Sequence, residues 1–82
     1  MSFVDHSVEN GVEEYMKLIR RTDELLRKFQ EDKTTTPPEK QHEVVERIDD
    51  VEVIRKQLIT HVKEKGISRE ILEKTSRLLS IF

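Results

Sequence analysis

Residues that interrupt helices concentrate at two places in this chain. Glycine and proline together account for four of the 82 residues; Pro37 and Pro38 follow three threonines, and Gly66 opens a short Gly-Ile-Ser segment. On either side of these breaks, apolar residues recur at steps of three and four, which is the period of one helix face. No stretch alternates strictly between apolar and polar residues, as a half-buried strand would. The pattern therefore predicts an all-α chain of three helices.

The helix boundaries follow from capping residues. The helices are expected at about residues 11–33, 37–65 and 69–81 of one domain covering residues 1–82. Asn10 or Ser7 suits the first start, because short polar side chains accept hydrogen bonds from free backbone N–H groups. Thr36 is expected to cap the second helix, with prolines in its first turn.

The joint after the second helix is the most compact. Gly66 can adopt the left-handed conformation that ends a helix, and Ser68 is expected to cap the next one. A joint this short makes the second and third helices antiparallel neighbours. The predicted fold is an antiparallel three-helix bundle, or a long helical hairpin with a shorter third helix.

The unequal helix lengths predict a surface. At about 1.5 Å per residue the expected lengths are roughly 35, 43 and 21 Å, so the third helix is too short to cover the whole hairpin. The uncovered end is predicted to bind a partner or a second copy through six apolar residues: Leu25, Leu26, Phe29, Val44, Val45 and Ile48. On this hypothesis Phe29→Asp dissociates an oligomer. The alternative is that these apolar side chains pack on one another within the monomer and need no partner.

Charge and composition exclude several classes. Fifteen basic and 17 acidic residues are interspersed, and a basic face of the kind that binds nucleic acid is not expected. No apolar run approaches the ~20 residues of a membrane span, and the first ten residues lack the features of a signal peptide. A cytoplasmic location is therefore expected. Cysteine is absent, which excludes disulfides and thiolate metal sites.

Chemistry-bearing residues are scattered. His6, His42 and His61 lie far apart and lack the spacing of a metal or catalytic motif. No catalytic residue, metal site or cofactor is predicted. The densest acidic cluster consists of Glu46, Asp49, Asp50 and Glu52. Since a mid-helix surface does not preorganise ligands for a cation, this cluster is better interpreted as a docking strip for a basic partner.

The last thirty residues resemble a known family. Arg55, Gly66, Ser76 and Leu79 have the spacing of an arginine, a turn glycine and two signature positions in the small sporulation-regulating aspartyl-phosphate phosphatases. Members of that family are helical hairpins that act on phosphorylated response regulators. Arg77, Leu78 and Ser80 replace the glutamine, glutamate and aspartate of the signature. The resemblance therefore implies a regulator that has lost catalysis.

Two functional hypotheses result. The first is a non-enzymatic protein-interaction or regulatory module that self-associates as a homodimer or docks a helical protein partner. The alternative is a bacterial phosphorelay regulator related to the phosphatases named above, without retained catalysis.

Overall fold

The computed structural model describes the backbone from Phe3 to Phe82 and the side chains from Gly11 onward. Helix α1 spans Phe3–Thr35, a short 3-10 turn η1 spans Pro38–Lys40, α2 spans Gln41–Lys65, and α3 spans Arg69–Leu79. No strand occurs in residues 3–82. The predicted all-α class, a helical bundle with a shorter third helix, is confirmed.

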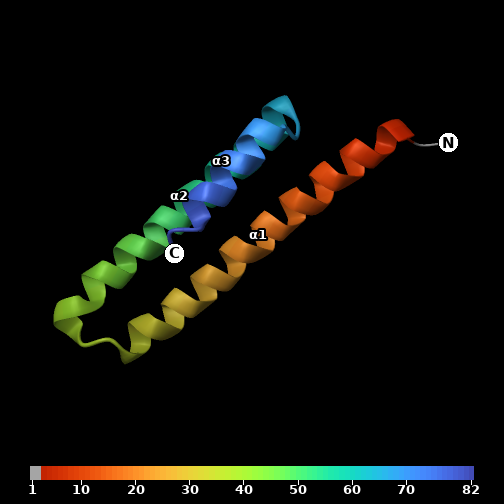
Figure 1. Ribbon diagram of the computed structural model, residues 1–82. Coiled ribbons are helices and arrows are strands. Elements are labelled where there is room, and N and C mark those ends of the chain that lie inside the picture. Colours follow the sequence, from red (N-terminus) through yellow and green to blue (C-terminus); the bar gives the residue numbers. More distant parts are fainter. Residues whose placement is uncertain (1–2) are drawn as a thin grey trace.

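The helices form a long, narrow bundle. Figure 1 shows α1 and α2 running in opposite directions, with α3 folding back along α2. Each of the three helices packs on both others. The bundle measures 57 × 20 × 18 Å, and its long dimension reflects α1, because 33 helical residues extend about 50 Å.

Two predicted helix starts are wrong. Helix α1 begins at Phe3, so Ser7 and Asn10, whose side chains lie outside the described ones, are inside the helix and not at its start. The cost of Gly11 within a helix is only about 1 kcal/mol, which a long helix tolerates. Thr36 does not cap the second helix: its hydroxyl donates to the Asp32 carbonyl, 2.5 Å away, and so satisfies the end of α1.

The joint between α2 and α3 forms as predicted. Gly66 ends α2 with φ of +81°, a conformation that L side chains rarely adopt. The Ser68 hydroxyl accepts a hydrogen bond from the Ile71 amide at 3.3 Å and caps α3. Ile67 of this joint rests on α1, where a Cβ added to Gly11 would lie 3.2 Å from its Cγ2. Gly11 therefore lets the joint approach α1 closely.

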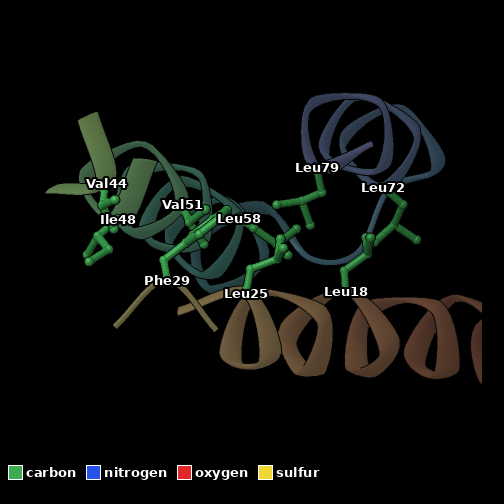
Figure 2. Packing of buried hydrophobic residues seen from close by; sticks show 9 residues of the cluster. All are labelled: Leu18, Leu25, Phe29, Val44, Ile48, Val51, Leu58, Leu72 and Leu79. Carbon is green, nitrogen blue, oxygen red and sulfur yellow. The ribbon is translucent and has the colours of Figure 1, made fainter. Parts of the chain in front are cut away.

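All three helices contribute to the core (Figure 2). Its buried apolar side chains are Leu18, Leu25, Phe29, Val44, Ile48, Val51, Leu58, Leu72 and Leu79. Leu18 of α1 points toward Leu72 of α3 at one end of the cluster, and Val44 and Ile48 of α2 close the other end. Thr22 is also fully buried. Its hydroxyl donates to the Ile19 carbonyl at 2.6 Å within the same helix, which offsets the cost of burying a polar group.

Candidate interaction surface

The predicted interaction residues lie mainly inside the monomer. Leu25, Phe29, Val44 and Ile48 are between 2% and 9% exposed. Only Leu26 and Val45 keep part of their surface in contact with solvent. The expectation that this end of the hairpin is uncovered is therefore wrong for four of the six residues.

The residues after α3 explain the difference. The ring of Phe82 packs edge-on against Phe29, with centroids 5.9 Å apart and planes 64° from parallel. Since α3 ends at Leu79, Phe82 carries apolar cover beyond the helix itself. Farther toward the α1–α2 turn, Val44 and Ile48 are buried with only two helices around them. At this end of the hairpin, the apolar side chains of α1 and α2 that face each other are few enough to bury one another without a third helix.

A shallow groove runs along the other side of the hairpin. It is formed by Leu26 and Gln30 of α1 and by α2 residues Asp49, Glu52, Val53, Arg55, Lys56, Ile59 and Thr60. None of these residues belongs to α3, so the groove lies on the face that α3 does not cover. Val53, in the middle of the α2 wall, is 53% exposed. The groove therefore presents apolar side chains with charged residues around them.

Helix α1 extends this surface toward its N-terminus. Val12, Met16, Ile19 and Leu26 follow helical spacing, with Asp23 between the last two. Val12 is 42% exposed and Met16 49%, while Ile19 and Leu26 are half-buried. We call the surface formed by Val12, Met16, Ile19 and Leu26 of α1 with Val53 and Ile59 of α2 the open face.

The apolar residues of α1 occupy more than one face. At about 100° per residue, they extend from Leu25, which is in the core, to Met16, roughly half the circumference of the helix. A helix that buries one side against a core usually needs an apolar stripe of about 100°. Since α2 and α3 cover one side of α1, the additional width of the stripe forms its part of the open face.

An ion pair joins α1 and α2 beside the groove. Arg55 Nε of α2 lies 3.3 Å from Asp23 Oδ1 of α1, and the side chains are 37% and 52% exposed. Arg55 Nε is buried but is not aligned for a hydrogen bond with any group in the described part of the chain, so the contact is electrostatic. Exposed pairs of this kind contribute about 0–1 kcal/mol. The pair therefore contributes little to stability, and its position marks which residues of α1 and α2 lie at the same level.

The residues behind the family resemblance occupy separate places. Arg55 lines the groove and contacts Asp23 of α1, and Gly66 forms the joint. Ser76 is exposed on α3, whereas Leu79 is 2% exposed and belongs to the core. Arg55 and Ser76 thus belong to different surfaces of the bundle.

The two histidines whose side chains are described do not form a common site. His42 is exposed and His61 half-buried on α2; His6 lies outside the described side chains. The described residues contain no cluster of histidine and carboxylate side chains suited to a metal ion. Among the helices described, none has the length and apolar content needed to cross a membrane.

Sequence reasoning missed most of the open face. Val12 and Met16 share the helical spacing of the buried positions of α1, so the sequence pattern does not distinguish them from core residues. Val53 is a single apolar residue whose neighbours three and four positions away are polar, which by itself does not indicate a surface. The available signal was the width of the apolar arc on α1. Comparison of the chain with family models, with curated proteins and with solved structures gave no match.

Proposed function

We propose that this protein is a non-enzymatic interaction module that docks a helix along the open face. The observation that carries the proposal is the partly exposed apolar surface on α1 and α2, at a groove that α3 leaves free. Val53, Met16 and Val12 are all more than two-fifths exposed. An amphipathic helix laid into an apolar groove is a recurrent mode of protein recognition.

The charges around the groove suit a protein helix better than a small ligand. Asp49, Glu52 and Lys56 all line it, so both signs of charge flank the apolar residues. An interface of this type combines an apolar centre with a polar rim. A small-molecule site, in contrast, is concave and encloses most of its ligand, which a shallow surface between two helices does not do.

The alternative interpretation is a solvated face that needs no partner. Single exposed apolar residues are common on protein surfaces and require no explanation. Ile81, near the C-terminus, is an example in this chain, because it is 77% exposed and lies outside the open face. The open face differs in that Val12, Met16 and Ile19 follow one another at helical spacing on α1. Leu26 of α1 and Val53 and Ile59 of α2 then line one groove. Contiguous apolar patches usually mark binding sites.

Site-specific photo-crosslinking in the native cells tests this proposal. A benzophenone amino acid placed at Val53 or Met16 is expected to capture a protein at least tenfold more efficiently than the same group at Ile81. Ile81 is the matched control, because it is apolar and more exposed but lies outside the open face. The captured protein, once purified, is expected to bind the chain at least tenfold more weakly after Val53→Arg. Equal capture at all three positions would overturn the proposal.

A regulatory role and a cytoplasmic location accompany this proposal as predictions. The phosphorelay role also stays a prediction. The contacts described above do not bring Arg55 and Ser76 together in one site, so they add no support for it.

A further inference from the structure

We infer that the helix docked on the open face is α2 of a second copy of this chain, in antiparallel orientation about Val53. This inference rests on the proposed function and names its partner. It is carried by the distribution of charge along α2, by the register of the α1–α2 pair, and by the position of Val45.

Helix α2 has opposite charges in its two halves. Residues 41–53 contain five acidic side chains and one arginine, whereas residues 54–65 contain four basic side chains and one acidic. The helix dipole favours this order, but its effect is confined to the first and last turns. Asp49, Glu52 and Lys56 lie in the middle of the helix and line the groove. The dipole therefore does not account for their arrangement.

The exposed charges form one stripe centred on Val53. Glu46, Asp49, Val53, Lys56, Thr60 and Lys63 are exposed and follow one another at steps of three and four. Residues spaced in this way share one side of a helix. The acids all precede Val53, and the lysines all follow it. Such a stripe is complementary to itself only when the second copy runs in the opposite direction.

Antiparallel pairing about Val53 matches the charges. Asp49 lies four residues before Val53 and Lys56 three after it, so Asp49 of one copy and Lys56 of the other differ in level by about 1.5 Å. For Glu46 and Lys63 the difference is about 4.5 Å, within reach of a lysine side chain. Parallel pairing would place each acid next to its own copy, which is unfavourable. The two-fold symmetry also gives a closed dimer.

The register of the hairpin then matches the apolar residues. Asp23 of α1 contacts Arg55 of α2, and Gly11 of α1 lies next to Ile67 of the joint that follows α2. In both pairs the residue numbers sum to 78. In an antiparallel pair centred on Val53, Val45 of the second copy lies level with residue 61 of α2 in the first copy. By the register above, this is also the level of residue 17 of α1, between Met16 and Ile19. The half-buried Val45 and the exposed Met16 would cover each other, and Val53 would pack beside Leu26.

Charge reversal with rescue tests this arrangement. An acidic chain carrying Lys56→Glu and Lys63→Glu, and a basic chain carrying Glu46→Lys and Asp49→Lys, are each expected to dimerise at least tenfold more weakly than wild type in sedimentation equilibrium. An equimolar mixture is expected to regain a species of twice 9.8 kDa, because all four charge contacts are opposite in the mixed dimer. The matched control for the acidic chain is Lys74→Glu with Arg77→Glu, which also replaces two basic residues by glutamate but at exposed α3 positions. This control should not alter dimerisation.

The outcomes separate this inference from the proposed function. A wild-type chain that remains at 9.8 kDa up to high micromolar concentration, or a mixture that stays monomeric, overturns the second-copy inference. If the Val53 crosslink then identifies a different protein, the docking function stands without self-association. If Val53 also fails to capture any protein above the Ile81 level, both are wrong.

Discussion

Phe29→Asp is expected to unfold the domain. The ring is 5% exposed and packs on Phe82, so the change removes a large core side chain and places a carboxylate among apolar groups. Loss of a buried phenylalanine costs about 3–5 kcal/mol, and an unpaired buried charge adds several more. The stability of 82 residues is about 4–12 kcal/mol in total. Far-UV circular dichroism should show loss of most helical signal at 25 °C.

The control for this variant is Val53→Asp, which introduces the same carboxylate at a position that is 53% exposed. This protein should retain wild-type helicity and lose only self-association. The sequence-based hypothesis that Phe29 is an interface residue makes the opposite prediction. If Phe29→Asp keeps full helicity and cooperative melting while losing an oligomer, then the ring does not belong to the monomer core.

Removal of residues 66–82 is the second change with a large expected effect. This truncation takes away Leu72 and Leu79, both nearly fully buried, whose burial contributes about 1.5–3 kcal/mol each. It also uncovers Leu18, which faces α3 in Figure 2. We expect residues 1–65 to lose cooperative thermal unfolding, as measured by circular dichroism.

Complementation controls for indirect effects of truncation. A synthetic peptide of residues 66–82 should restore helicity to the 1–65 fragment, and the same peptide with Leu72→Asp and Leu79→Asp should not. Wild-type melting behaviour of the 1–65 fragment alone would show that the α1–α2 hairpin does not depend on α3.

Local signals in the sequence were sufficient for the helices and for one joint. Gly66 and Ser68 each determine a conformation through their own backbone or side chain, so the α2–α3 joint was predictable. The start of α1 was not predictable in this way. A residue that is able to cap a helix, such as Asn10, does not have to do so when the residues before it are also helical. Thr36 shows the same ambiguity, since one hydroxyl can serve the end of one helix or the start of the next.

The surface was harder to predict because it depends on tertiary placement. Helical spacing identifies Val12 and Leu18 equally as apolar positions of α1, yet the first is 42% exposed and the second 7%. What separates them is the side on which α3 packs, and the sequence pattern of α1 does not specify it. The cover that Phe82 gives to Phe29 was missed for a related reason: it follows the last helix, where periodicity gives no information.

Disulfide formation at position 53 tests the central claim most directly. The chain contains no cysteine, so Val53→Cys and Ile81→Cys each provide a single thiol. Exposure alone predicts faster oxidation to a covalent dimer at position 81, which is 77% exposed against 53% for Val53. Antiparallel docking about Val53 predicts the reverse, at least tenfold faster dimer formation at position 53 at equal protein concentration. Faster or equal oxidation of the Ile81→Cys chain would contradict docking of a second copy on the open face.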